Sequence, residues 1–327
     1  MSLYTPPIKT IWPIWKPLVL AIILYLSLTP ANAFDVLLGT SVPGTFSHFS
    51  GRMLERTINK QIIGIHCKVV PGSGDIHNLT NLVQGSLDIA LVDSRTLYDA
   101  MNKTENFQFL DINYKSLSVI VPLYDVTISL IVGHNSGIKK LDDLKGKRIN
   151  AGPPLSPQNL FFKTISTAKN WSKNDFMLVT ELSDSQSQDT MAFCHGNLDA
   201  MIHIGIHPDS SLNQLFKLCN ADVADMDDID IERLVSGHPS FSKVIIPSGT
   251  YLGQKTNINT LGTQTLMVAS QDLDEEIVYK ILDAIFSNQK KLSNSHPALS
   301  LQKPDTTKTK AMGLELHAGA VEYFSKN

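Results

Sequence analysis

Two small-residue loops constrain the fold of this chain more than any other feature. Each follows an apolar run and opens a helical pattern: the first loop spans residues 39–45 and the second 71–74. A further apolar run at 87–92 closes the unit. Buried strands that alternate with helices predict a mostly parallel α/β sheet covered on both faces. The loops then meet at one sheet edge, where helix N-termini direct backbone N–H groups toward an anion.

The same order of elements is repeated further along the chain. Two β-type runs, 117–124 and 127–132, are separated by a break, which we interpret as the crossing into a second lobe. Strands are expected at 148–151 and 198–204, with a helix between them after the loop at 152–159. The second lobe is therefore expected to have its own loops at a sheet edge.

The chain is expected to return to the first lobe near its end. Residues 261–270 have the pattern of a return strand, 275–292 that of an amphipathic helix, and 302–310 that of a solvated loop. Two crossings between two α/β lobes predict a hinge and an interlobe cleft. The predicted organisation is a signal peptide at 1–33, lobe 1 at 34–123 plus 251–327, and lobe 2 at 124–250.

Residues 1–33 have the pattern of a secretory signal peptide. Lys9 and Lys16 precede an apolar segment at 18–26, no acidic residue occurs, and Ala31-Asn32-Ala33 has the small-x-small form of a cleavage site. We expect cleavage after Ala33 and export to the periplasm, with an uncleaved N-terminal anchor as the alternative. No later segment has about 18 consecutive apolar residues.

Composition and charge argue against some classes of function. The formal net charge is −3, and no long basic run occurs, which argues against nucleic-acid binding. Of the three cysteines, Cys194 and Cys219 are the more plausible disulfide pair, with Cys67 free; three reduced thiols are the alternative. No CxxC motif occurs, and neither a metal nor a cofactor is expected.

A series of motifs, in order along the chain, is similar to one known family. The motifs lie at 39–45, 71–79, 85–92, 135–138, 141–148, 196–200, 205–208 and 246–254. They resemble the TAXI class, the extracytoplasmic solute receptors of TRAP transporters.

That resemblance implies a two-lobed fold of the type II periplasmic-binding-protein class. It also implies capture of a small organic anion, of the dicarboxylate or acidic amino acid type, for a TRAP-type membrane permease. A binding protein for an ABC importer or a sensor is a close variant. A secreted enzyme on the same scaffold is the rival from another class, although no nucleophile–base pair or catalytic motif supports it.

The sequence departs from the family pattern inside the expected site. Val42-Pro43 stands where glycine-rich residues are usual, and proline removes one N–H donor. In lobe 2 the loop contains Ser156 and Gln158 in place of a Gly-Ser-Gly-Thr sequence, and Asp93-Ser94-Arg95 replaces a Gln-Ser-Asp. These departures put the usual ligand class in doubt more than the fold.

Hydroxyl and amide groups of lobe 1 are the first candidate ligand contacts. Thr40, Ser41 and Thr45 precede one helix, and Ser73 and Asn78 accompany the next. They can bind a carboxylate, or they can serve as ordinary helix caps.

A charged pair follows the third strand. Arg95 can bind a carboxylate while Asp93 accepts from an ammonium group, which suits a zwitterionic amino acid. The alternative is a salt bridge between neighbouring elements. Asp75 can simply cap its own helix.

Lobe 2 and the crossings supply the remaining candidates. Ser156 and Gln158 are expected to complete the site when the lobes close. Tyr124 and Tyr251 lie near the two crossings and can form aromatic walls or pack the hinge.

Four histidines could suggest a metal site. His203 and His207 have i,i+4 spacing, but Gly205 and Pro208 make a helix there unlikely. We therefore expect these two, with His195 and His238, to be structural or surface residues.

Overall fold

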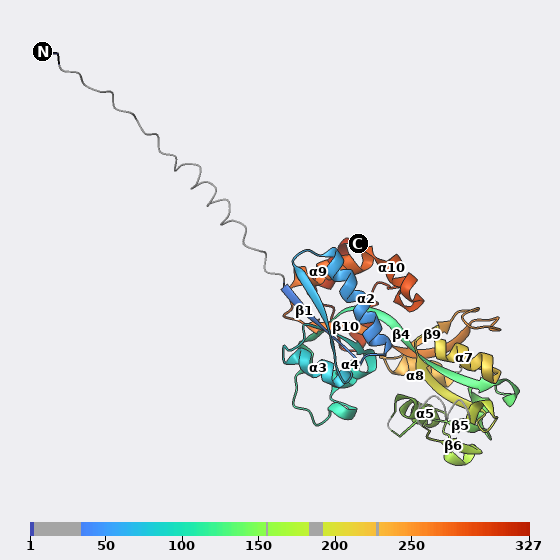
Figure 1. Cartoon of the computed structure of the whole chain (residues 1–327). Coiled ribbons are helices and arrows are strands. Elements are labelled where there is room, and N and C mark those ends of the chain that lie inside the picture. Colours follow the sequence, from blue (N-terminus) through green and yellow to red (C-terminus); the bar gives the residue numbers. More distant parts are fainter. Residues whose placement is uncertain (3–33, 155, 183–191, 227–228) are drawn as a thin grey trace.

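The computed structural model of this chain (Figure 1) describes residues 1–2, 34–154, 156–182, 192–226 and 229–327. The expected signal peptide falls almost wholly on residues 3–33, which lie outside the described residues, so its cleavage after Ala33 stays a prediction. Among the described residues, no helix is both long enough and apolar enough to cross a membrane.

One mixed sheet runs through both lobes. In order across the sheet the strands are β2 (Ile65–Pro71), β1 (Phe34–Thr40), β3 (Ile89–Asp93), β10 (Ile258–Ser270), β4 (Leu117–Gly133), β7 (Ala200–Gly205), β5 (Arg148–Asn150) and β6 (Leu178–Thr180). In addition, β8 (Ala221–Ala224) pairs with β4, and β9 (Ser242–Ile246) pairs with β10. Strands β1, β2 and β3 are parallel and belong to lobe 1, whereas β5, β6 and β7 are parallel and belong to lobe 2.

The two long strands β4 and β10 join the lobes. They pair antiparallel from Ile128–Leu261 at one end to Leu117–Ser270 at the other. The break expected at residues 125–126 is wrong, because Asp125 and Val126 pair with β10 and keep β4 continuous. The hinge is therefore a pair of hydrogen-bonded strands and not a loose linker.

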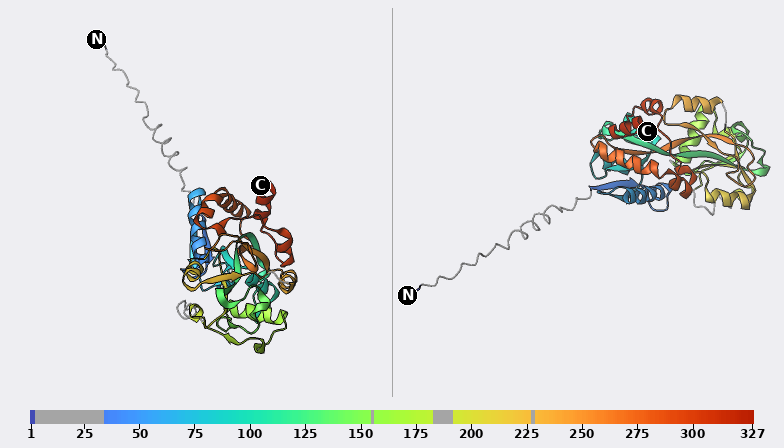
Figure 2. Two further views of the ribbon diagram at one scale, coloured as in Figure 1. Left: turned by 90° about the vertical axis from the view of Figure 1, so that its right-hand side faces the viewer. Right: turned by 90° about the horizontal axis from the view of Figure 1, so that it is seen from above.

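Helices cover both faces of the sheet, as Figure 2 shows. Lobe 1 carries α2 (Phe46–Gln61), α3 (Asp75–Val83), α4 (Ser94–Asn102), α9 (Glu275–Ser287), α10 (Gln289–Ser295), α11 (Thr306–Ala311) and α12 (Ala318–Lys326). Lobe 2 carries α5 (Pro157–Ala168), α7 (Ser210–Cys219) and α8 (Ile229–Gly237).

Two helical details differ from the sequence prediction. The helix expected at 275–292 is interrupted at Asn288, where α9 ends and α10 begins. The loop expected at 302–310 contains α11, because the Asp305 carboxylate accepts hydrogen bonds from the N–H groups of Thr307 and Lys308. Such an N-cap can start a helix in a polar sequence.

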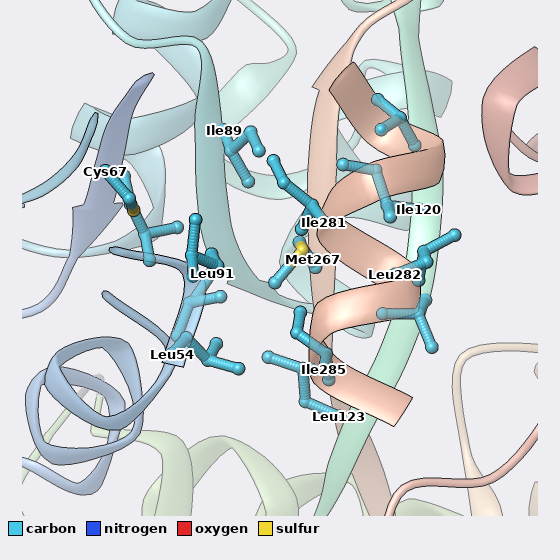
Figure 3. Packing of buried hydrophobic residues seen from close by; sticks show 14 of the residues in the cluster. Leu54, Cys67, Ile89, Leu91, Ile120, Leu123, Met267, Ile281, Leu282 and Ile285 are labelled. Carbon is cyan, nitrogen blue, oxygen red and sulfur yellow. The ribbon is translucent and has the colours of Figure 1, made fainter. Parts of the chain in front are cut away.

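Alternation along β10 places side chains on the two faces of the lobe 1 sheet. Met267 and Ala269 belong to the cluster that packs under α2 and α9 (Figure 3). Leu266 and Val268 belong to the cluster on the opposite face, under α3 and α4. Lobe 2 is likewise built around two clusters of its own, so each lobe has an independent core.

The expected disulfide is confirmed: Cys194 is joined to Cys219. Cys67 is free and buried in the lobe 1 core. Burial raises the pKa of its thiol to about 12, which keeps it protonated and unreactive at neutral pH.

Gly262 gives a test of the strand crossing. A Cβ atom at this position would lie 2.3 Å from the backbone carbonyl oxygen of Val126, which cannot move without separating β10 from β4. We expect Gly262→Ala to lower the free energy of unfolding by about 2 kcal/mol, measured by urea denaturation. Gly237→Ala is the control, because a Cβ there meets no atom within 4 Å. Equal effects of the two substitutions would contradict this account of the hinge.

Candidate functional site

The loops that follow the lobe 1 strands meet, as the sequence predicted. β1, β2 and β3 are parallel and end at Thr40, Pro71 and Asp93. The N–H of Gly72 donates to the Thr40 carbonyl at 2.8 Å and so joins the first loop to the second. Carboxyl ends of parallel strands are the usual place for a ligand in an α/β sheet.

The hydroxyl groups of the first loop are used mainly within the protein. Thr40 is completely buried, and its Oγ1 lies 3.2 Å from His48 Nδ1. Thr45 is the N-cap of α2: its hydroxyl accepts from the His48 N–H and donates to the Val42 carbonyl. The Ser41 N–H donates to Ser47 Oγ at 3.2 Å. The capping alternative therefore accounts for Thr45, while the ligand role of all three stays a prediction.

The second loop leaves more groups free. Ser73 is exposed, and Gly74, the N-cap of α3, has φ 128° and ψ −172° and provides no side-chain cap. Asn78 is completely buried, yet neither its Oδ1 nor its Nδ2 has a hydrogen-bond partner. A Cβ on Gly72 would lie 2.7 Å from Asn78 Oδ1, so the amide sits against the loop. Among the candidate hydroxyl and amide groups of lobe 1, the side chains of Ser73 and Asn78 take the smallest part in hydrogen bonds within the described structure.

Two carboxylates lie side by side at the same edge. The Asp93 N–H donates to Asp75 Oδ2 at 2.9 Å. Asp93 is the N-cap of α4, where its Oδ1 accepts from the Arg95 N–H at 2.8 Å, and its Oδ2 accepts from the Thr263 hydroxyl of β10. Burial, together with the charge of Asp93, raises the pKa of Asp75 to about 7. Burial also raises the pKa of Asp93.

Tyr124 lies at the crossing, as expected, and packs against lobe 1. Only 6% of its surface is exposed, its hydroxyl is 3.3 Å from Ser50 Oγ, and its ring meets the Phe46 ring edge-on at 4.9 Å between centroids. Burial raises its pKa, so the hydroxyl remains protonated. Packing at the hinge explains the position of the Tyr124 ring. The charges of Asp75 and Asp93 also raise the pKa of its hydroxyl.

Arg95 connects the lobes. Its Nε lies 3.8 Å from Asp99 Oδ2, and its guanidinium carbon lies 5.3 Å from the centre of the Phe241 ring in lobe 2. Beside it, the buried Ser94 hydroxyl donates to the Ser240 carbonyl at 3.0 Å. These contacts join α4 to the segment before β9 and give Arg95 a structural role, while its predicted binding of a solute carboxylate stays untested.

The lobe 2 candidates lie around one glycine. Ser156 is the N-cap of α5 and accepts from the Asn159 N–H at 3.2 Å. Gln158 is buried. Gly152, at φ 78°, passes so close that a Cβ there would be 2.9 Å from Ser156 Oγ and 2.8 Å from Gln158 Cβ. In the described part of the chain, no hydrogen bond joins Ser156 to the lobe 1 loops, so their convergence stays a prediction.

Tyr251 belongs to a polar network that the sequence did not reveal. It packs in a cluster with Ile131 and Leu212, and its hydroxyl accepts from the Asp209 N–H at 2.9 Å and contacts His207 Nδ1. His207 Nε2 lies 2.9 Å from Ser129 Oγ, and His203 Nε2 lies 3.2 Å from Asp209 Oδ2. The i,i+4 histidines were a visible signal, but their carboxylate, tyrosine and serine partners come from other elements.

Titration within this network follows from burial and hydrogen bonding. Burial lowers the pKa of His207 to about 4, so its ring is neutral at physiological pH. Burial opposes ionisation of Asp209, but hydrogen bonds from His203 and Ser211 outweigh it and hold the pKa of that carboxyl below its usual range. Among the described residues, no group of three or more His, Cys, Asp or Glu side chains is placed to hold a metal ion.

Two cavities lie away from these loops. A surface depression of about 850 Å³ on lobe 1 lies along the start of α9 and is lined by charged side chains, among them Asp274, Glu276 and Lys280. A cavity of about 10 Å³ lies inside the apolar core of lobe 2, which is room for one water at most. Neither contains a residue nominated from the sequence.

Comparison with known proteins decides the family. The chain matches the NMT1-like family over residues 38–326. It belongs to the NMT1-like family. This corrects the assignment drawn from the sequence, because the matching family is the NMT1-like family and not the TAXI class of TRAP receptors.

One solved structure, with a TM-score above 0.5, confirms the fold of this NMT1-like protein. PhnD1 from Prochlorococcus marinus (MIT 9301), solved with methylphosphonate, is 13% identical with a TM-score of 0.53 over 90% of this chain and 100% of its own. The periplasmic sulfonate-binding protein SsuA from Methylobacillus flagellatus KT is 12% identical, with a TM-score of 0.49 over 86% and 77%. SsuA from Escherichia coli is 18% identical, with a TM-score of 0.48 over 89% and 83%. The two-lobed α/β fold of the periplasmic binding proteins, predicted from the sequence, is confirmed.

The contact of Arg95 with Phe241 is testable by a double-mutant cycle. The Phe241 ring is buried, and a guanidinium over such a ring contributes about 1–2 kcal/mol. We therefore expect a coupling of that size between Arg95→Ala and Phe241→Leu in the free energy of unfolding, measured by urea denaturation. Additive effects would show that the contact contributes nothing. If Arg95 instead binds a solute carboxylate, Arg95→Ala would weaken solute binding more than tenfold without any coupling to Phe241.

Asp75 makes stability depend on pH in a defined direction. The folded protein keeps this proton up to about pH 7, whereas an unfolded aspartate loses it near pH 3.9. Between these values the folded state binds more protons, so stability falls as pH rises. Asp75→Asn should remove this loss, so its stability relative to the wild type should rise by up to about 4 kcal/mol between pH 4 and pH 8. Urea denaturation at both pH values measures it, with Asp274→Asn, at an exposed N-cap of the same lobe, as control.

Proposed function

We propose that this protein is an exported solute-binding protein that captures a small polar molecule between its lobes without changing it chemically. The supporting observation is the meeting of lobe 1 strand ends with the hinge: Asp93 bonds to Thr263 of β10, and Asp75 bonds to Asp93. Groups placed there can sense a solute and the angle between the lobes at the same time. Contacts to the solute from both lobes then favour the closed form.

The serine–histidine contact at the hinge supports binding over catalysis. Ser129 Oγ lies 2.9 Å from His207 Nε2, the arrangement that activates a nucleophile in hydrolases. Ser129 is completely buried within β4, so no substrate reaches its hydroxyl. His207 is held on its other nitrogen by Tyr251. The pair therefore fits a structural role.

The partner we propose is the membrane permease of an ABC importer. Membership of the NMT1-like family supports this choice, which the sequence left open as a variant. The periplasmic location predicted from the sequence is compatible with this role, and PhnD1, which shares the fold, was solved with a small solute, methylphosphonate. At 13% identity that complex supports the kind of ligand site and not the ligand.

The solute class predicted from the sequence was a small organic anion or amino acid. The N-terminus of α3 favours a negative group, since Gly74 leaves its first N–H groups without a side-chain cap. The carboxylates of Asp75 and Asp93 at the same edge oppose a purely anionic solute. A solute that carries both charges satisfies both features.

The direct experiment is to purify the protein, denature it and identify released small molecules by mass spectrometry. The molecule found is then added back to refolded protein. We expect this molecule to raise Tm and to be recovered intact. At a concentration of one hundred times Kd, it should raise the free energy of unfolding by about 2.7 kcal/mol. Conversion of the added molecule would favour the secreted enzyme, and the absence of any stabilising solute would contradict the proposal.

A further inference from the structure

The pair formed by Asp75 and Asp93 is surrounded by hydroxyl groups from several elements. Thr263 and Tyr124 come from the two hinge strands, and Thr96 of α4 bonds to Asp75. Asp75 and Asp93 both remain partly exposed, whereas Thr263 and Tyr124 are buried. The hydroxyls lie around the two carboxyl groups, and burial raises the pKa of each carboxyl.

Within the described residues, the charge of Arg95 offsets this pair only in part. Arg95 is the charged neighbour of Asp93, but its side chain is directed to Asp99 and to the Phe241 ring of lobe 2. Within the described ranges, no ion pair joins a lysine or arginine side chain to Asp75 or Asp93. Burial and the charge of Asp93 raise the pKa of Asp75, so this pair keeps a proton up to about pH 7 unless a cation from outside displaces it.

Asn78 is an independent sign of a missing ligand group. It lies three residues after Asp75 on the same face of α3. Its side chain is completely buried, both polar atoms lack a partner, and Oδ1 is directed at Gly72 in the loop that opens α3. A buried amide without partners costs about 1–3 kcal/mol, which a bound polar group would recover.

We propose that lobe 1 holds the protonated amine of its solute between Asp75 and Asp93, so that the solute is an amino acid or amine and not a dicarboxylate. This inference rests on the proposed function and names the solute class of the same site. An ammonium group carries three N–H donors. Asp75, Asp93 and the Asn78 carbonyl oxygen provide acceptors of suitable chemistry at the strand ends. A carboxylate on the same solute would use the N–H groups at the start of α3.

The change in bound protons when the solute binds has opposite signs for a solute with an amine and for a purely anionic solute. The groups that face Asp75 are Asp93, Tyr124 and, through Asp93, Arg95. The pKa of Asp75 lies at about 7 in the free protein. An ammonium group lowers this pKa, so its binding at pH 7 releases a proton, whereas an anion raises the pKa and its binding takes a proton up.

The experiment uses solute pairs that differ in the amine. L-glutamate and L-aspartate are compared with glutarate and succinate, together with the other L-amino acids and putrescine, first by thermal shift. Binding members are then titrated calorimetrically at pH 7 in phosphate and in Tris. We expect an amine-bearing member to bind at least tenfold more tightly than its partner without the amine, with a net release of protons. Preference for a dicarboxylate, proton uptake, or no binding by any amine overturns the inference.

Asp93→Asn separates recognition from folding. This variant keeps an N-capping oxygen for α4 but loses the charge, and we expect at least a tenfold loss of affinity for the amine-bearing solute. Asp274→Asn, at the N-cap of α9 away from the site, is the control and should keep full affinity. Unchanged affinity in Asp93→Asn would sink the inference. If a co-purified solute without an amine is found, only this inference fails; if no solute stabilises the protein at all, the proposed function fails with it.

Discussion

The antiparallel pairing of β4 with β10 is the interaction on which the rest of the structure depends. The two strands belong to both lobes, so the same ladder of backbone hydrogen bonds supports the cores on either side of the hinge. Gly262 allows the ladder to pass the Val126 carbonyl closely. Because the hinge is a ladder, the lobes can move only by twisting or bending these strands, and groups attached to them, such as Thr263 and Tyr124, sense that motion directly.

Some polar groups at the edge of lobe 1 make hydrogen bonds within the protein, and others make none. Thr45 and Asp93 satisfy the first N–H groups of α2 and α4, an essential task because these donors have no partner inside a helix. By contrast, Gly74 caps α3 without a side chain, and the side chain of Asn78 makes no hydrogen bond. The second loop is therefore the part of this edge whose polar groups we propose for binding a solute.

Local patterns were enough to predict the parallel strands, most helices, the two lobes and the Cys194–Cys219 bond. They failed where distant residues decide the structure. The short polar stretch inside β4 looks like a break until β10 pairs with it, and Arg95 resembles a ligand residue until Phe241, far along the chain, is placed beneath it. A hydroxyl before a helix has the same sequence signature whether it caps or binds, so the site residues could be nominated but not assigned. The family, inferred from short motifs shared by many binding proteins, was also wrong.

The two lobes share a buried asparagine near the start of a helix. An asparagine followed by leucine stands near the start of α3 and again near the start of α5, at Asn78 and Asn159. Each is buried, each has an Oδ1 without a partner, and each lies against a glycine of the preceding loop, Gly72 or Gly152. A buried amide oxygen is retained at such a cost when something outside the lobe completes its bonding. Among the described residues, no hydrogen bond joins an acidic side chain to Asn159, so we assign the charge-specific part of the proposed recognition to lobe 1.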